Sequence, residues 1–334
     1  MKAELRILFD DRVLDTAAER FGLGRTTLRR LDSFENVVLE ATRDGLSCIL
    51  RISHNSHRTL DQVQAELDWL DYLARNGISV SIPLRSRQDL LVERLEENGE
   101  TFIAVVFERA RGGFVRKDDW TPQMTFNRGR LLGRMHALTK GYEPPSGKIR
   151  RHAWYEEDDF VSYRNYLRPG DEIVAERFAE LQAALRAIPI DRESWGLIHM
   201  DPHTGNMFFD DDHPTLFDFD DCSYDFFVSD IAISLFYAVL MHPEDSRQAF
   251  GRDFLHTLLK GYRTENRLDN RWRDVIPLIL KRREILLYVA IHHGYNEVDF
   301  DEWCRRYLDG RRERIRDRAP YLDMDWSEFD LAGG

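Results

Sequence analysis

Apolar and polar positions follow two different patterns along this chain, and the pattern changes close to residue 110. Between residues 28 and 108 the apolar residues stand in short runs separated by turn residues, which is typical of strands. Helical spacing of apolar residues predicts two helices in the same part, over 11–21 and from 60 to about 76. The expected strands cover residues 28–31, 36–41, 47–52, 90–95 and 102–108. The pattern therefore predicts a small sheet with one crossing helix.

The second pattern begins after the segment Ala110-Arg111-Gly112-Gly113, which predicts a linker. Beyond it, apolar residues recur every three or four positions, as expected for helices with one buried face. The expected helices cover residues 124–138, 171–187, 229–241, 250–263, 272–292 and 302–318. We predict an α+β chain with two lobes, a sheet lobe over residues 1–108 and a mainly helical lobe over residues 109–334.

The composition restricts the classes of protein that fit this pattern. A chain of 334 residues with 43% hydrophobic residues is long enough for two lobes with ample cores. The net charge of −12 argues against nucleic acid as a partner, because a phosphate backbone favours a basic surface. Arginines between residues 305 and 318 alternate with acidic residues, which favours a salt-bridged helix over a nucleic-acid arm.

Cysteine usage and hydropathy indicate the compartment. Cys48, Cys222 and Cys304 are widely separated, so we expect reduced packing residues and neither a zinc site nor a disulfide. No apolar run is long enough to span a bilayer, and the first residues lack the apolar stretch of a secretion signal. We therefore expect a cytoplasmic protein that does not bind membranes.

Four polar residues, His199, Asp201, Asn206 and Asp218, stand at a spacing that indicates phosphate chemistry. Protein kinases place a base Asp and a metal-binding Asn five residues apart on a loop opened by His, and a second metal-binding Asp on the next hairpin. One carboxylate can orient a hydroxyl and accept its proton, while an amide and a carboxylate can hold Mg²⁺ on ATP. Asp and Asn are also common in surface turns, so the spacing alone is not sufficient.

The neighbouring residues favour the phosphate site over a surface turn. Met207-Phe208-Phe209 and Thr215-Leu216-Phe217 predict two strands joined by a polar turn. This hairpin places Asn206 at one end and Asp218 at the other, as two ligands of one ion require. We expect a phosphoryl-transfer site that uses ATP and Mg²⁺.

Longer stretches of the chain resemble the aminoglycoside phosphotransferase and choline kinase family, the small-molecule kinases of the protein kinase-like fold. The matching stretches are His199-Met200-Asp201-Pro202-His203-Thr204-Gly205-Asn206, which is similar to the family's H-G-D-x-H-x-x-N loop, Phe217-Asp218-Phe219-Asp220, Ser229-Asp230-Ile231-Ala232, and residues 132–138. The resemblance runs from about residue 28 to residue 240. It implies a bilobal kinase-like fold, with a nucleotide-binding lobe over 1–108 and the catalytic loop and acceptor site within 109–334.

The resemblance also implies a role for each matching residue of the helical lobe. Asp201 would be the catalytic base, and Asn206 and Asp218 would be the Mg²⁺ ligands. The loop would be supported by three further residues, His199, His203 and Asp230, of which Asp230 would accept backbone hydrogen bonds.

In the sheet lobe, the third strand of such folds supplies a cation for the ATP phosphates, paired with a helix carboxylate. Arg51 stands there in place of the commoner Lys, and Glu66 is the matching carboxylate; the alternative is an exposed strand Arg with no role. Backbone groups of Glu108 and Ala110 would face adenine, with Phe107 packing between the lobes. The turn over residues 32–36 contains no glycine, so no glycine-rich phosphate loop is expected.

The acceptor is expected to be a small polar molecule that carries an amine, such as an aminoglycoside-like antibiotic, an amino alcohol or a homoserine-like metabolite. Asp220, Asp221 and Asp225 follow the metal Asp, and an acidic rim of this kind suits cationic amines. Residues 156–159 are also acidic, and a solvated charge run explains them equally well.

Two other classes stay open. A non-catalytic kinase-like protein that binds nucleotide would usually lack the base or a metal ligand, and here all three are present. A protein Ser/Thr kinase of the bacterial stress-response type is the second alternative. The short distance from Asp218 to the helix expected at Ser229 leaves little room for a long activation segment.

Overall fold

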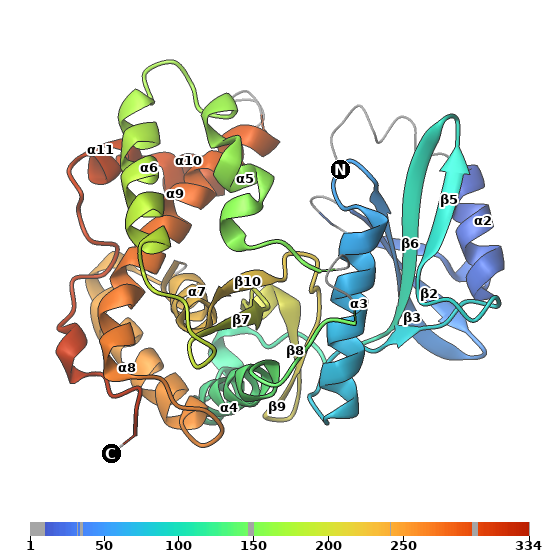
Figure 1. The fold of residues 1–334 in the computed structure, drawn as a ribbon, viewed down its shortest axis with the longest axis horizontal. Coiled ribbons are helices and arrows are strands. Elements are labelled where there is room, and N and C mark those ends of the chain that lie inside the picture. The colour runs from blue at the N-terminus through green and yellow to red at the C-terminus, as the bar shows by residue number, and fades with distance from the viewer. Residues whose placement is uncertain are drawn as a thin grey trace.

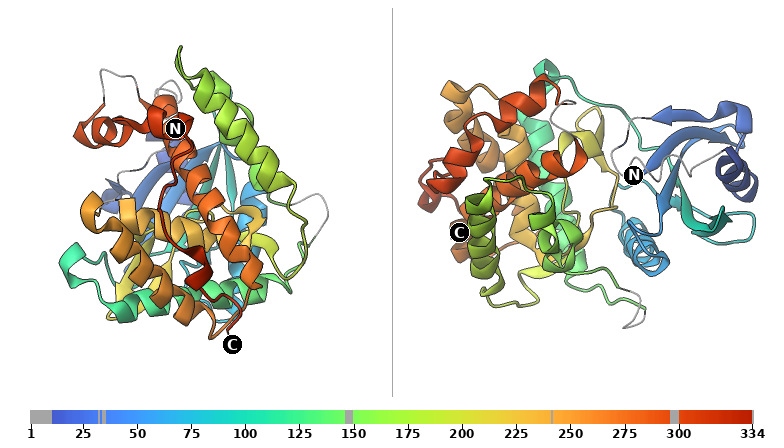
Figure 2. Two further views of the ribbon diagram at one scale, coloured as in Figure 1. Left: turned by 90° about the vertical axis from the view of Figure 1, so that its left-hand side faces the viewer. Right: turned by 90° about the horizontal axis from the view of Figure 1, so that it is seen from above.

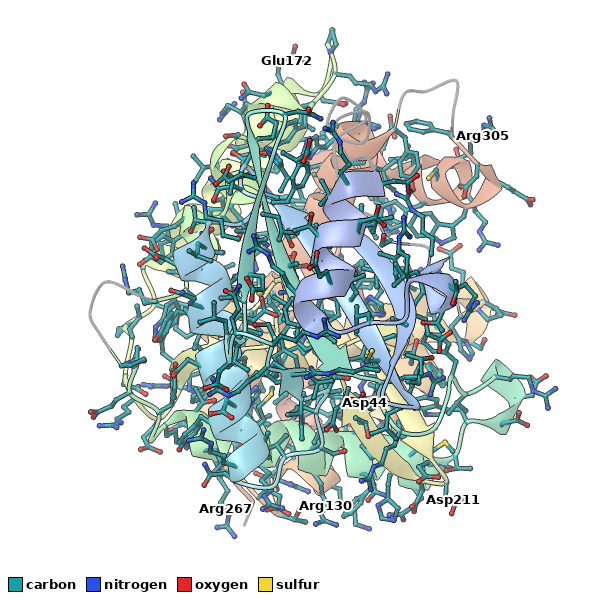
Figure 3. All side chains as sticks on the ribbon, turned by 90° about the vertical axis from the view of Figure 1, so that its right-hand side faces the viewer. Asp44, Arg130, Glu172, Asp211, Arg267 and Arg305 are labelled. Carbon is teal, nitrogen blue, oxygen red and sulfur yellow. The ribbon has the colours of Figure 1, made fainter. Side chains whose placement is uncertain are left out.

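The computed structural model describes residues 11–31, 33, 36–145, 150–240, 242–295 and 300–333. These residues form two lobes, a small one built on a sheet and a larger one built of helices (Figure 1). Seen from above, the lobes lie side by side and the chain crosses between them (Figure 2). The charged residues Arg130, Glu172, Asp211, Arg267 and Arg305 lie at the outline of the molecule when it is viewed from the small-lobe side (Figure 3).

The small lobe contains one antiparallel sheet. Its strands are β1 Arg29–Leu31, β2 Val37–Arg43, β3 Leu46–His54, β4 Pro83–Leu84, β5 Glu93–Glu97 and β6 Glu100–Glu108. The order is β1-β2-β3-β6, and β4 and β5 pair with different parts of β6. Every expected strand of this lobe is present within a few residues of its expected bounds, while the short β4 was not expected.

Period-two alternation in β3 and β6 gives the sheet two apolar faces. One face packs against α2 (Asp11–Phe21) through residues that include Leu50, Phe102 and Ala104. The other face packs against α3 (Leu60–Arg75) through Ile103 and Val105. Because Arg51 alternates with Leu50, its side chain lies on the α3 face, which is also the face toward the helical lobe.

The larger lobe consists of helices around two short strand pairs. The helices are α4 Pro122–Thr139, α5 Asp158–Val161, α6 Glu172–Arg186, α7 Phe227–Leu240, α8 Glu244–Tyr262, α9 Ile276–Gly294, α10 Glu302–Leu308 and α11 Arg311–Arg316. The strand pairs are β7 Trp195–Ile198 with β10 Ser223–Phe226, and β8 Met207–Asp210 with β9 His213–Leu216. The α+β prediction with two lobes is confirmed. None of the described helices is long and apolar enough to cross a membrane.

Helices α4 and α8 pack with their backbones in contact. A Cβ atom placed on Gly261 would lie 1.9 Å from the carbonyl oxygen of Phe126, and one on Gly129 would lie 2.0 Å from that of Leu258. The approach therefore requires glycine on both helices. It also brings Tyr262 of α8 to 2.9 Å from Nδ1 of His136 on α4.

Three expected helices were wrong in their extent. The helix expected over 250–263 begins at Glu244, and the one expected over 272–292 begins at Ile276, after a 3-10 helix over Asn270–Val275. The single helix expected over 302–318 is two helices, α10 and α11, separated at Asp309 and Gly310. Gly310 has a φ of 63°, a left-handed conformation that ends a helix and that glycine adopts without strain. Within this stretch, Arg311, Arg312, Arg316 and Arg318 pair with acidic residues, Arg311 with Glu284 for example. All three cysteines are buried and free.

Candidate active site

The expected catalytic loop follows β7 and is held by one buried carboxylate. Asp230, at the start of α7, accepts the backbone N–H groups of His199 at 3.0 Å and Met200 at 2.9 Å. Met200 has a φ of 71°, at the position where the family pattern has glycine. A left-handed non-glycine residue costs about 1–2 kcal/mol, and the two hydrogen bonds offset this cost. Asp230 therefore braces the loop in the manner the sequence predicted.

His199 connects this loop to the hairpin that carries Asp218. Burial lowers the pKa of His199, so the ring is neutral at pH 7. Its Nδ1 accepts the N–H of Asp201 at 3.2 Å, and its Nε2 donates to the carbonyl of Phe217 at 2.9 Å. The ring thus fixes the base and the hairpin relative to each other.

The carboxylate of Asp201 is held at both oxygens. Oδ2 lies 3.1 Å from Nε2 of His203 and 3.2 Å from the amide nitrogen of Asn206. Oδ1 accepts a hydrogen bond from the guanidinium of Arg283. Burial raises the pKa of Asp201, but the charges of Arg283 and His203 outweigh it and hold that pKa well below its usual range. Asp201 is therefore ionised at neutral pH.

Asn206 and Asp218 lie at the two ends of the β8–β9 hairpin, as predicted. The amide nitrogen of Asn206 also donates to the carbonyl of Asp201 at 3.1 Å, which leaves its oxygen as the atom for a metal. Burial, followed by the neighbouring charge of Asp220, raises the pKa of Asp218 to about 6. A buried pair of carboxylates with a surplus of negative charge suits a divalent cation.

A second observation fits a Mg²⁺ ion that is bound together with phosphate. Oδ1 of Asp220 is buried and has no hydrogen-bond partner among the described residues. The described part of the chain contains no group of three or more His, Cys, Asp or Glu residues that could hold a metal. Mg²⁺ needs no such cage, because one or two protein oxygens, phosphate oxygens and water complete its shell.

The small lobe supplies the expected ion pair. Nη1 and Nη2 of Arg51 each lie 2.8 Å from an oxygen of Glu66, and both side chains are buried. The guanidinium also lies 5.2 Å from the ring centre of Phe107 and 3.7 Å from Oδ1 of Asp220. This geometry excludes the alternative of an exposed strand Arg. The part that the pair plays in nucleotide binding stays a prediction.

The hinge residues separate into two groups. Phe107 and Ala110 line the cleft between the lobes, whereas Glu108 is exposed and its backbone N–H donates to the carbonyl of Ile82 at 2.8 Å. That N–H is therefore not available to adenine. In the turn over residues 32–36, Asp32, Phe34 and Glu35 lie outside the described residues.

The expected acidic rim is wrong in part. Asp225 is fully buried and pairs with Arg282 at 2.5 Å, because its position in β10 turns it away from the cleft. Asp220 is buried and bonds His57 at 2.7 Å, on the side of Arg51 and Asp218. Asp221 alone of the three has an exposed side chain, with 47% of its surface accessible, and it lies 3.0 Å from Arg58.

The acidic run over residues 156–159 is engaged within the protein. Glu156 accepts the backbone N–H of Ala153, and Asp158 accepts hydrogen bonds from Ser162 and Tyr166. Glu157 bonds Arg58 at 2.8 Å and also pairs with His152. The side chain of Asp159 lies outside the described set. These contacts make a structural role the better explanation for the run.

Two buried arginines, Arg58 and Arg151, hydrogen-bond the segment that follows Asp218. Arg58, between β3 and α3, donates through Nε to the carbonyl of Asp220 at 3.1 Å. Arg151 donates to the same carbonyl at 2.6 Å. Both side chains are buried, so the two lobes share one buried polar contact at this peptide group.

Sequence reasoning missed two residues beside the base, Arg283 of α9 and Tyr237 of α7. Both line a cleft of about 970 Å³ that also contains Asp201, Asn206 and Asp218. A signal for Arg283 was present, since Lys281-Arg282-Arg283 is a basic run inside an otherwise apolar helix. On the side of α9 and α10 the cleft has an apolar wall formed by Leu286, Leu287, Ala290, Ile291 and Trp303.

Comparisons with known proteins agree with this geometry. Residues 27–272 match the phosphotransferase enzyme family. Amicoumacin kinase of Bacillus subtilis (strain 168) is 36% identical over 327 residues, which cover 96% of each chain. The solved structure of an amicoumacin kinase in complex with AMP-PNP, Ca²⁺ and Ami superposes with a TM-score of 0.93 at 33% identity, over 98% of this chain and 99% of that chain.

A more distant structure shares the fold. The microcompartment-associated aminopropanol kinase superposes with a TM-score of 0.72 at 20% identity, over 92% of this chain and 98% of that chain. The bilobal kinase-like fold and the resemblance stated from the sequence are therefore confirmed. The chain belongs to the phosphotransferase enzyme family and is an ATP-dependent phosphotransferase that works with Mg²⁺.

Proposed function

We propose that this enzyme transfers the γ-phosphoryl group of ATP to a hydroxyl of a small, amine-bearing molecule of the amicoumacin type. The observation that carries the proposal is the position of Asp201 in the cleft, where the Mg²⁺ ligands adjoin an apolar wall from α9 and α10. The relatives named amicoumacin kinase, which cover nearly the whole chain, support the same acceptor class.

Each residue of the proposed mechanism acts mainly by position. Asp201 accepts a hydrogen bond from the acceptor hydroxyl and takes its proton as the new P–O bond forms and the bond from the γ-phosphorus to the β–γ bridging oxygen breaks, with ADP as the leaving group. Arg51, fixed by Glu66, orients the ATP phosphates. Asn206 and Asp218 hold Mg²⁺, which offsets charge on the phosphate oxygens. Rate enhancement then comes from alignment and from fixed charges in a partly dry cleft.

The charges of the described cleft favour an acceptor with few amines. Of the three carboxylates expected at the rim, only Asp221 has an exposed side chain, and Arg283 adds a positive charge close to the base. An aminoglycoside with several ammonium groups needs several carboxylates to match them. One amine together with an apolar part suits this cleft better.

The experiment is a screen for acceptor-dependent ADP formation. Purified enzyme with Mg²⁺ and ATP is assayed against amicoumacin, an aminoglycoside panel, simple amino alcohols and homoserine, and the product is identified by mass spectrometry. We expect phosphorylated amicoumacin, formed with the highest kcat/KM of the set. A kcat/KM at least ten-fold higher for an aminoglycoside or homoserine contradicts the proposed acceptor class. Transfer to a protein Ser or Thr side chain favours the protein kinase alternative.

We also propose the division of labour between the lobes that the sequence predicted. Residues 1–108 would bind the nucleotide, and residues 109–334 would carry the catalytic loop and the acceptor site. A small-molecule acceptor, no nucleic acid partner and a cytoplasmic location complete the proposal.

A further inference from the structure

Two side chains from outside the catalytic loop surround the base. Arg283, on α9, donates through Nη2 to Oδ1 of Asp201 and, at 2.5 Å, to the hydroxyl of Tyr237. The guanidinium carbon lies 5.0 Å from the ring centre of Tyr237 on α7, so the ring supports the cation as well. Both residues line the cleft.

Tyr237 connects this pair back to the catalytic loop. Its ring centre lies 4.8 Å from that of His203, and Nε2 of His203 lies 3.1 Å from Oδ2 of Asp201. Asp201, Arg283, Tyr237 and His203 therefore form a closed ring of contacts, which we call the base clamp. Within the clamp, Arg283 holds one carboxylate oxygen of Asp201 and His203 holds the other. The residues of the clamp come from three separate parts of the chain, the catalytic loop, α7 and α9.

The neighbouring Arg282 shows that the placement of Arg283 is specific. Arg282 is buried, pairs with Asp225 at 2.5 Å and lies 3.3 Å from the hydroxyl of Ser229, away from the lining of the cleft. Both arginines satisfy a buried carboxylate, but only Arg283 does so in the cleft at the reacting centre. A purely structural role explains Arg282 and leaves the position of Arg283 unexplained.

We propose that Arg283, supported by Tyr237, is a positioning residue of the phosphoryl transfer: it fixes the Asp201 carboxylate so that the acceptor hydroxyl meets it in line with the γ-phosphate. This proposal deepens the proposed function and rests on it for the acceptor. A carboxylate without its Arg283 contact can rotate about its side-chain torsions. A displacement of about 1 Å at a reacting group can cost about 10²-fold in rate.

The test compares matched variants of adjacent arginines. Arg283→Ala, Arg283→Lys and Tyr237→Phe are assayed beside Arg282→Lys, with kcat, the KM for ATP, and melting temperature measured for each. We expect kcat to fall about 10²-fold in Arg283→Ala and about ten-fold in Arg283→Lys, because an ammonium on a flexible stem is held less firmly between Asp201 and Tyr237 than a guanidinium stacked on the Tyr237 ring. The KM for ATP stays within two-fold. Arg282→Lys lowers the melting temperature but keeps kcat.

Chemical rescue separates positioning from folding. Methylguanidinium in the assay should raise the activity of Arg283→Ala at least ten-fold and leave the activity of Arg282→Lys unchanged. A kcat in Arg283→Ala within three-fold of the wild type overturns the proposal. A fall in kcat without rescue, matched by a fall in melting temperature like that of Arg282→Lys, also overturns it. If Arg283→Ala does not fold, Arg283→Lys and Tyr237→Phe decide by the same kcat criterion.

A parallel assay tests the base clamp without any acceptor molecule. Slow release of phosphate from ATP, with water in place of the acceptor, is measured in the same variants. The clamp predicts the same order of loss, because water also needs an oriented Asp201. Failure of every acceptor in the screen contradicts the proposed function, whereas equal hydrolysis rates in all variants contradict the clamp.

Discussion

Asp218 carries a buried carboxyl group, and burial disfavours the charged form of that group. Burial and the adjacent charge of Asp220 raise its pKa to about 6, above the value near 3.9 of an unfolded chain. The ionised carboxylate therefore destabilises the ligand-free fold, and this cost grows as the pH rises from about 4 to 6 and is complete above that range. A metal ion bound at the proposed ligand Asp218 would offset this cost.

The Asp218→Asn variant should therefore be more stable and inactive. We expect the free energy of unfolding of the ligand-free protein to rise by on the order of 2 kcal/mol at pH 8, with a smaller gain at pH 4. Mg²⁺-dependent ATP binding should be lost. Urea unfolding at the two pH values and calorimetry measure these effects.

An exposed carboxylate is the control for Asp218. Asp89→Asn, in a turn whose φ of 63° Asn tolerates, should leave stability unchanged at both pH values. If Asp218→Asn is no more stable than the wild type at pH 8, the ionised side chain is already compensated within the protein.

Asp201 supplies the second residue-scale prediction. Asp201→Asn keeps the shape of the side chain but removes the proton acceptor, so we expect kcat to fall about 10²- to 10⁴-fold. The affinity for ATP with Mg²⁺ should stay within a few-fold, because the base contacts the acceptor and not the nucleotide. Single-turnover kinetics and nucleotide titration measure the two effects, and near-wild-type turnover would falsify the assignment.

Residues whose positions depend on local spacing were predictable from sequence, while their roles stay predictions. His199, Asp201, Asn206 and Asp218 lie on one loop and one hairpin, so their spacing carries the geometry. Arg283 lies 82 positions from Asp201, and nothing local connects them. The prediction that Asp225 lies at the acidic rim was wrong. Its closeness in sequence to Asp218 does not reveal that β10 turns its side chain into the core.

At the scale of elements, the contact between α4 and α8 depends on glycine. Gly261 faces the carbonyl of Phe126, and Gly129 faces that of Leu258, so any side chain there must push the helices apart. The same contact positions His136, whose Nε2 lies 3.1 Å from Asp230, the brace of the catalytic loop. Packing of these two helices therefore affects the active site indirectly.

The Gly261→Ala substitution tests this packing. We expect a loss of about 3 kcal/mol or more in the free energy of unfolding, because backbone atoms cannot yield to an added methyl as a side chain can. Gly141→Ala is the control, since its Cβ would make only ordinary contacts of 3.5 Å or longer. Chemical denaturation measures both variants, and equal stabilities would show that the helices shift without cost.

Sequence patterns predicted the existence of elements better than their ends. The helix over 11–21 was predicted with the observed bounds, and the strands of the small lobe differ by a few residues. The helix over 302–318 was wrong because periodicity continued through Gly310, where the backbone turns left-handed. The α4–α8 contact was not predicted, because glycines in a helix do not indicate which other helix packs against them.

At the scale of the whole molecule, Arg58 holds carboxylates of the helical lobe from the small lobe. It lies 2.8 Å from Glu157 and 3.0 Å from Asp221, and it is almost fully buried. Burial raises the pKa of Glu157, but the hydrogen bond with His152 and the charge of Arg58 outweigh it and hold that pKa well below its usual range. The stability from this pairing is present above about pH 4.5 and is lost as the pH falls.

The Arg58→Met substitution tests how much this buried network contributes to the free energy of unfolding, and an exposed ion pair serves as the comparison. We expect the free energy of unfolding at pH 7 to fall by about 3–5 kcal/mol, because the buried Asp220 and the largely buried Glu157 lose a cation. The deficit should shrink as the pH falls below about 4.5, because the stability that ionised Glu157 gains from Arg58 is lost in that direction. Arg75→Met removes an exposed pair with Asp71 and should cost less than about 0.5 kcal/mol. A pH-independent deficit in Arg58→Met would point to lost packing instead.

The apolar wall of the cleft has a consequence for how such an enzyme can be blocked and how it can change. The wall comes from α9 and α10, whereas the proposed Mg²⁺ ligands and Arg51 come from the hairpin and the sheet. Under the proposed function, substitutions on the wall would change which acceptor is phosphorylated and leave the residues proposed for ATP and Mg²⁺ intact, a separation that favours rapid adaptation to new acceptors. An inhibitor anchored on the wall and on Arg283 would engage the part of the cleft that the proposed mechanism assigns to the acceptor. It could thereby spare kinases that share only the nucleotide half.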